Sequence, residues 1–238
     1  MKMQEQARMG YDRSITMFSP DGRLLQVEYA KKTVRQGSTA IGFTCKDGVV
    51  LVADKRSSGR LIVAKAIEKT FKIDNHLAAT ASGIISDARV LIERAQMKAQ
   101  QHAVTYDTPV DIITIVKDIS DLCQYTTQSA GLRPFGVSLI IAGIDDGQPK
   151  LYVTDPTGIY FQYYATVIGE GEIDIEKVLQ KKYKASMTMA EALELAVSTL
   201  KEYLGEDFNA DRLDAIYIPI NNPQVNDFSR EDIRKAAQ

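Results

Sequence analysis

Apolar residues recur every three or four positions along several stretches of the chain, a spacing that predicts helices with one buried face. Leu24, Val27, Ala30 and Val34 form the first such stripe, which stops at Gly37, a residue suited to ending a helix. The same reasoning predicts further helices over 86–103 with Ser86 or Asp87 as cap, 109–128, 173–183, 189–204 and, after a cap at Ser229, as far as Ala236.

Runs rich in Val and Ile, bounded by turn residues, predict the strands. Residues 38–44 and 49–55 flank Lys46-Asp47-Gly48 and are typical of a hairpin. Four strands in the first half favour one antiparallel sheet, and a second sheet is expected from the strands that follow. The remaining expected strands are 70–74, 77–82, 137–144, 150–155, 159–169 and 213–220.

The order of these elements predicts the fold class. Each expected sheet is followed by a pair of helices, and no linker separates the two halves. Such elements bury their apolar faces best as sheet on sheet with helices outside, a four-layer α/β/β/α sandwich of the α+β class. Residues 38–238 are therefore expected to form one domain. Residues 11–37 would add an N-terminal segment and helix, and the polar residues 1–10 a mobile tail.

Composition removes several classes of partner. Lys and Arg total 29 against 31 Asp and Glu, a net charge of -2, so neither nucleic acid nor an anionic membrane is an expected partner. No apolar run suits a membrane span, and residues 1–10 do not resemble a signal peptide, which favours an intracellular protein. Cys45 and Cys123 are expected as reduced core thiols. His76 and His102 do not form a ligand pair, so no metal site is expected.

One long motif resembles a known family. Residues 11–42, YDRSITMFSPDGRLLQVEYAKKTVRQGSTAIG, look like the N-terminal signature of proteasome α subunits of the archaeal type. Further matches run through ADKR at 53–56, IEKTFKID at 67–74, ASGIISDARVL at 81–91, RPFGVSLIIAGID at 133–145 and DPTG at 155–158. The resemblance covers essentially the whole chain. It implies the fold of the N-terminal nucleophile hydrolases, in agreement with the sandwich expected from the apolar pattern.

The related proteasome β subunits are threonine proteases, which makes a self-processing hydrolase the first alternative. Ser38 follows Gly37 where the β subunits would be cut, and Asp54 and Lys69 align with their acid and lysine. However, the nucleophile works through its own α-amine, and Ser38 has none while it is bonded to Gly37. The preceding residues also carry the most specific signature in the chain. No catalytic residue is therefore expected, although Asp54 can equally be a strand-end carboxylate paired with Arg56 or another cation.

The resemblance implies a pocket between neighbouring subunits. In it Lys69 would receive the C-terminal carboxylate of an activator such as a hexameric AAA ATPase, beside Gly22, Leu24 and Gly37. The simpler interpretation of Lys69 is a solvated charge next to a strand.

The resemblance also implies a gate over an axial pore. Tyr11, Asp12, Pro20 and Tyr29 match the residues that hold its open state, and Arg13 completes the Tyr-Asp-Arg signature. The pore loop would comprise Gln128, Ser129, Ala130 and Gly131. Without the resemblance, Tyr11 is an isolated surface aromatic and residues 128–131 are an ordinary connection.

Together these expectations describe a non-catalytic subunit of the outer heptameric ring of the proteasome core particle, without a cofactor. Its partners would be six further α subunits, the β subunits of an α7β7β7α7 assembly, an ATPase activator and unfolded polypeptide. Such a protein would act in ATP-dependent or ubiquitin-like protein degradation in the cytoplasm. A free-standing scaffold that keeps the fold without a protease partner is the second alternative.

Overall fold

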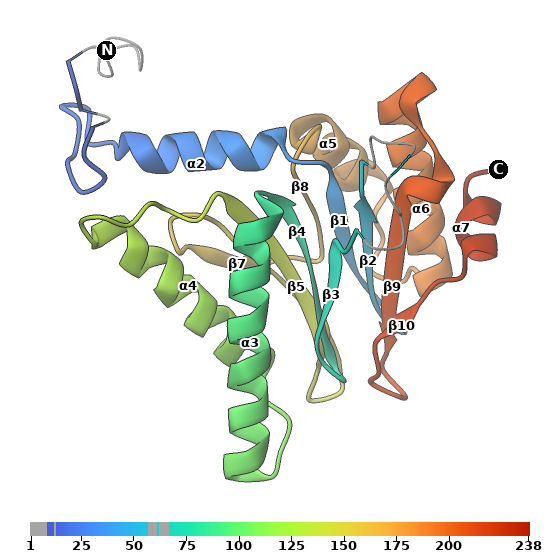
Figure 1. Ribbon diagram of the computed structural model, residues 1–238. Coiled ribbons are helices and arrows are strands. Elements are labelled where there is room, and N and C mark those ends of the chain that lie inside the picture. The colour runs from blue at the N-terminus through green and yellow to red at the C-terminus, as the bar shows by residue number, and fades with distance from the viewer. Residues whose placement is uncertain (1–8, 12, 57–60, 62–66) are drawn as a thin grey trace.

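Two five-stranded antiparallel sheets form the inner layers of the protein (Figure 1). The computed structural model describes residues 9–11, 13–56, 61 and 67–238. The first sheet has the order β10-β9-β2-β1-β8 and the second the order β3-β4-β5-β6-β7. The first comprises β1 (Ala40–Cys45), β2 (Gly48–Asp54), β8 (Ala165–Ile168), β9 (Leu213–Pro219) and β10 (Asn226–Asp227). The second comprises β3 (Thr70–Asp74), β4 (Leu77–Gly83), β5 (Val137–Asp145), β6 (Gln148–Thr154) and β7 (Tyr160–Gln162).

Helices cover the outer face of each sheet (Figure 1). Helices α3 (Ile85–Tyr106) and α4 (Ile112–Gln128) pack on the second sheet, and α5 (Glu172–Lys182) and α6 (Met189–Leu204) on the first. Short 3-10 turns at Gly205–Asp207 and Ala210–Arg212 lead into β9, and α7 (Arg230–Ala236) packs beside α6. The expected four-layer sandwich is confirmed.

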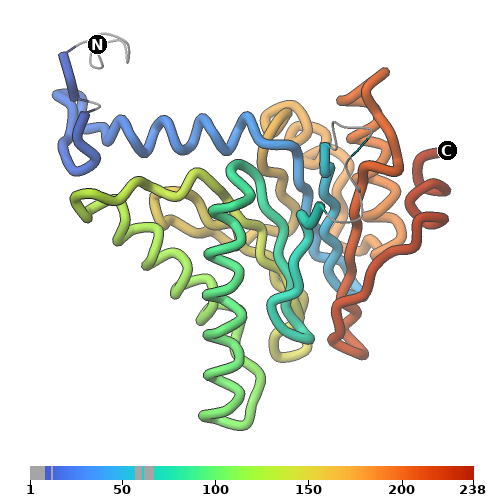
Figure 2. The backbone as a smooth tube through the Cα atoms, viewed as in Figure 1, coloured from blue at the N-terminus to red at the C-terminus, as the bar shows by residue number. Residues whose placement is uncertain are grey.

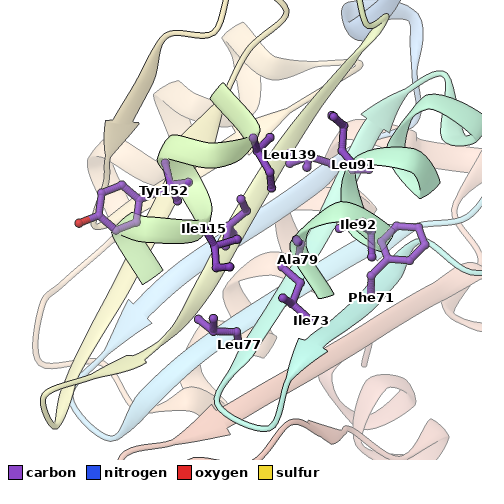
Figure 3. Packing of buried hydrophobic residues seen from close by; sticks show 14 of the residues in the cluster. Phe71, Ile73, Leu77, Ala79, Leu91, Ile92, Ile115, Leu139 and Tyr152 are labelled. Atoms are coloured by element: carbon purple, nitrogen blue, oxygen red, sulfur yellow. The ribbon is translucent and has the colours of Figure 1, made fainter. Parts of the chain in front are cut away.

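Three hydrophobic clusters separate the four layers. One lies between the second sheet and helices α3 and α4, where Phe71, Leu91, Ile115 and Leu139 meet (Figure 3). The other two lie between the sheets and between the first sheet and helices α5 and α6. Every residue of β1, β2 and β5 is buried, because these strands are covered on both faces. Continuous apolar runs in the sequence are typical of such strands. Cys45 and Cys123 are buried free thiols, as expected, and burial raises the pKa of each to about 12.

Helix α2 (Leu25–Gln36) lies across one end of the sandwich, against β4 and β5 (Figure 2). Its buried face consists of Leu25, Val27, Ala30 and Val34. The predicted stripe is therefore confirmed except at its start, where Leu24 is the half-buried N-cap and Leu25 takes the buried position. The N-terminal segment continues beyond the helix at one corner of the molecule.

Two strand predictions were wrong. The run 159–169 is not one strand, because it breaks after Gln162 into β7 of the second sheet and β8 of the first. The first four strands also do not share a sheet: β1 and β2 belong to the first, and β3 and β4 to the second. The sequence of a turn does not indicate whether the strand after it joins the same sheet or the other sheet.

One helix cap was also wrong. Helix α3 starts after Ile84, without a side-chain cap. Asp87 instead accepts two hydrogen bonds of 2.6 Å from the Arg133 guanidinium and one of 2.9 Å from the Gly136 amide. Burial raises the pKa of Asp87, but these bonds and the Arg133 charge outweigh it and hold that pKa below its ordinary value. Asp87 thus anchors the end of the loop that follows α4. The expected caps at Gly37 and Ser229 are confirmed. Within the described residues, no helix is long and apolar enough to cross a membrane.

Candidate functional site

The ammonium group of Lys69 is buried where α2 gives way to β1. Its Nζ donates to the Ser38 hydroxyl at 2.7 Å and to three carbonyl oxygens. These belong to Ser38 at 2.5 Å, Thr39 at 3.0 Å and Asp54 at 2.9 Å. Only 2% of Lys69 is exposed, so it is not the solvated charge of the simpler interpretation. Burial lowers the pKa of Lys69 to about 7, even though the charge of Asp54 acts in the opposite direction.

The carboxylate of Asp54 is held by Arg212. The Arg212 guanidinium donates to both carboxylate oxygens, at 3.0 and 2.6 Å, and the Arg56 amide donates to one of them at 3.0 Å. Asp54 is 1% exposed, and the bidentate contact with Arg212 replaces the water that its carboxylate would otherwise bind. The expected pairing with a cation is therefore confirmed. Arg212 lies 158 residues further along the chain, and no local pattern identified it.

Hydrogen bonds of the preceding Gly37 and of the Ser38 carbonyl hold the backbone at Ser38 in place. The Gly37 amide donates to the Thr33 and Val34 carbonyls at the end of α2, while the Gly37 carbonyl accepts from the Glu170 amide at 2.8 Å. The Ser38 carbonyl also accepts a hydrogen bond from the Ser82 hydroxyl at 2.9 Å. A Cβ atom on Gly37 would lie 2.2 Å from the Gly83 nitrogen, so only glycine fits this close approach.

This arrangement lacks the base that an N-terminal nucleophile needs. The Ser38 nitrogen is part of the peptide bond to Gly37, and the chain before it is folded as α2. The Lys69 Nζ lies within hydrogen-bond distance of four oxygen acceptors, one more than its three N–H groups. Through these hydrogen bonds, Lys69 and Ser38 connect the end of α2 to both sheets.

The four residues expected to form the activator pocket do not meet within one chain. Gly37 adjoins Ser38 and so lies near Lys69 at the end of α2, whereas Gly22 and Leu24 precede its first residue. A helix of 12 residues separates the two pairs by about 18 Å. Gly22 is exposed, has φ +72°, and has open space where a Cβ would stand.

The N-terminal segment and the loop after α4 meet at one corner of the molecule. They line a cavity of about 470 Å³. Its walls are Arg13, Ser14, Ile15, Thr16, Gln26 and residues 130–133. This corner unites Arg13 with Ala130 and Gly131 from the expected gate and pore loop, while Gln128 ends α4 and Ser129 is its C-cap. It carries the exposed side chains of Met9, Met17 and Phe18.

The other expected gate residues have separate positions. Tyr11 is half-buried, and Pro20 is exposed in the turn that the Gly22 amide closes on the Ser19 carbonyl at 2.8 Å. Tyr29 lies on α2 and is half-buried. Asp12 and residues 1–8 lie outside the described residues. In the part of the chain that the structure describes, no group of three His, Cys, Asp or Glu side chains is placed to hold a metal ion.

Sequence reasoning missed three residues that shape these sites. Arg212 fixes Asp54, Ser82 fixes the Ser38 carbonyl, and Asp87 fixes Arg133 at the end of the loop. None of these contacts had a local signal, because the partners lie 158, 44 and 46 residues apart along the chain.

Comparison with known proteins gives consistent matches over nearly the full chain. Residues 34–218 match the family described as proteasome subunit, and residues 11–32 match the N-terminal signature of A-type proteasome subunits. The chain is 47% identical to the proteasome subunit alpha of Methanocaldococcus jannaschii, over 94% of this chain and 86% of that one. It is 47% identical to the protein of that name from Pyrococcus abyssi, over 95% and 86%. For Archaeoglobus fulgidus the identity is 44%, over 95% and 92%.

Replacement of Lys69 is expected to destabilise the chain. Lys69→Met keeps the aliphatic stem but leaves three buried carbonyl oxygens without their donor, so the free energy of unfolding should fall by about 2–3 kcal/mol. Lys72→Met is the matched control, because Lys72 is exposed on β3 and its Nζ donates to the exposed Asn75 side chain. Urea unfolding followed by circular dichroism measures both. Equal stability of the two variants would contradict a structural role for Lys69.

Proposed function

Because the chain belongs to the proteasome subunit family and carries the N-terminal signature of its α type, we propose that it is a non-catalytic subunit of the outer ring of the proteasome core particle. In this role it controls access of unfolded polypeptide to a chamber whose nucleophiles lie on other chains. The observation that carries the proposal is the peptide bond between Gly37 and Ser38, which lies inside the fold.

The packing of residues 25–37 supports this role over self-processing. Leu25, Val27, Ala30 and Val34 are buried against the sandwich, and the Gly37 carbonyl is bonded to Glu170. Cleavage before Ser38 would remove α2 and expose the apolar surface beneath it. A propeptide that is discarded needs no such contacts. The alternative that uses Ser38 as a nucleophile is therefore not favoured.

The corner shared by the N-terminal segment and the loop after α4 supports a gating role. Residues 13–16 and 130–133 line one cavity, so the segment that follows the tail lies beside the proposed pore loop. Tail residues 1–10 would then block the pore by occupying it. Tyr11, Asp12, Pro20 and Tyr29 would stabilise the open state, and an activator that binds only that state would shift the population toward it.

The separation of the pocket residues along α2 supports a site between neighbouring copies. Lys69 and Gly37 of one subunit would meet Gly22 and Leu24 of the next, which requires a ring. We therefore include six further α subunits, two rings of β subunits and a hexameric AAA ATPase in the proposal, and a cytoplasmic location. Because Lys69 is already bonded to four oxygens, an incoming carboxylate would have to displace at least one of them.

Removal of the tail tests the gate. Deleting residues 2–10 should raise peptide hydrolysis by an assembled complex severalfold in the absence of activator, because the pore loses its occupant. Hydrolysis of a short fluorogenic peptide by co-purified α and β subunits measures this. A variant with the same nine residues in scrambled order is the control, and should stay closed if occupancy alone matters. Wild-type hydrolysis after the deletion would contradict the gate.

A charge at Gly22 tests the activator pocket without disturbing Lys69. Gly22→Asp should weaken the stimulation of peptide hydrolysis by the ATPase at least tenfold, about 1.4 kcal/mol. The new carboxylate would repel the C-terminal carboxylate of the activator. Gly22→Asn has nearly the same size, and both residues tolerate a positive φ better than other side chains. The Asn variant should therefore retain stimulation. Equal stimulation of both variants would contradict the pocket, and native mass spectrometry verifies that both form rings.

A further inference from the structure

A cavity of about 540 Å³ lies between α5 and the connection from β7 to β8. Three tyrosines line it: Tyr163 and Tyr164 lie in the connection, and Tyr183 is the C-cap of α5. Glu176 on α5 is the only charged residue among the described residues that line the cavity. Aromatic faces beside a carboxylate attract organic cations, so the lining favours a positively charged ligand.

Hydrogen bonds to the neighbouring strands hold the walls of this cavity. The Tyr163 amide donates to the Leu151 carbonyl at 2.9 Å, and the Tyr164 carbonyl accepts from the Thr44 amide at 2.7 Å. The Tyr183 hydroxyl donates to the Thr44 carbonyl at 3.1 Å. The cavity is therefore formed before a ligand arrives, which lowers the entropic cost of binding.

The carboxylate of Glu176 is not neutralised by a neighbouring cation. It accepts a hydrogen bond of 3.3 Å from the Gln180 amide, and it forms no ion pair within the part of the chain that the structure describes. Lys177, the next residue along α5, is paired with Asp174 at 2.9 Å. Burial and then the charge of Glu176 raise the pKa of Tyr163. The negative potential of Glu176 thus reaches the aromatic wall.

Strand β7 beside the cavity has an unpaired edge. It pairs with β6 and ends the second sheet, so no described strand covers its other side. Ile159, Phe161 and Tyr163 alternate along this segment and are 50%, 61% and 38% exposed. The rings of Phe161 and Tyr163 meet edge to face at 6.5 Å. An extended peptide has the same alternation and pairs with open sheet edges, whereas a small ligand in the cavity would leave this row uncovered.

We propose that β7 and the adjacent cavity bind an extended peptide that inserts one arginine side chain into the cavity. The peptide would continue the second sheet as a strand beside β7 and cover Ile159 and Phe161. Its guanidinium group would lie against the Tyr164 ring and donate to the Glu176 carboxylate. The planar, always charged guanidinium suits both contacts better than an ammonium group. This inference goes beyond the proposed function, because it concerns the single chain and requires no ring.

Binding of a labelled peptide to the purified full-length chain tests the proposal. The probe is a short fluorescein-labelled peptide of alternating threonine and valine with arginine at its centre, and fluorescence anisotropy measures its Kd. Replacing the arginine by citrulline, which has the same shape without the charge, should raise Kd about tenfold. Methylating alternate backbone amides of the peptide should also raise Kd severalfold, because the strand pairing is lost.

Two variants of the chain locate the site. Glu176→Gln and Tyr164→Ala change exposed side chains, so each should fold as wild type by circular dichroism and raise Kd about fivefold. Glu202→Gln on α6 and Tyr106→Ala on α3 are the matched controls. Both positions are exposed and outside the lining of the cavity, so these variants should bind the peptide as wild type does.

Three results would overturn the proposal. The first is that wild type does not bind the peptide, and the second is that the Glu176→Gln and Tyr164→Ala variants bind it as tightly as wild type. The third is that free arginine amide binds as tightly as the peptide, which would assign the cavity to a small organic cation. None of these results depends on the assembly of a ring, so they are distinct from the results that test the proposed function.

Discussion

A single buried ammonium group ties the N-terminal helix to both sheets. Lys69 enters from the segment before β3 and donates to oxygens of Ser38, Thr39 and Asp54, at the start of β1 and the end of β2. A buried cation is tolerated only where such acceptors replace water. The geometry of this junction therefore depends on an uncut chain from Gly37 to Thr39. The close approach of Gly37 to Gly83 reinforces it, because no side chain fits between the two backbones.

The roles of Ser38, Asp54 and Lys69 depend on whether the chain is cut before Ser38. A cut there would free an amine that could act as a base for the neighbouring hydroxyl. Here the nitrogen of Ser38 is part of the peptide bond to Gly37, so its electron pair is delocalised into the carbonyl group and is not basic. A lysine and an acid at these positions then stabilise a junction. On the proposed function, that junction is what allows one end of α2 to meet the next subunit and the other to stay fixed.

The sequence was informative where local spacing decides structure. The helix over 189–204 and the cap at Ser229 follow from apolar period and capping chemistry, and the structure has both. Spacing does not record which sheet a strand joins, so the break between Gln162 and Ala165 was missed. It also does not record long-range partners. Asp54 was expected to pair with a cation, but Arg212 reaches it only because β9 lies beside β2. Similarly, the alternative interpretation of Lys69 as a solvated charge was wrong, because the tertiary fold surrounds its ammonium with oxygens.

The integrity of the Gly37–Ser38 bond is the central claim, and a native mass spectrum of the chain expressed alone tests it most directly. One spectrum reports both the mass of the protomer and the number of protomers in each assembly. The account predicts uncut protomers that retain residues 1–37 and assemble in sevens. A protomer that begins at Ser38 would contradict it, because the buried junction would then be a processing site.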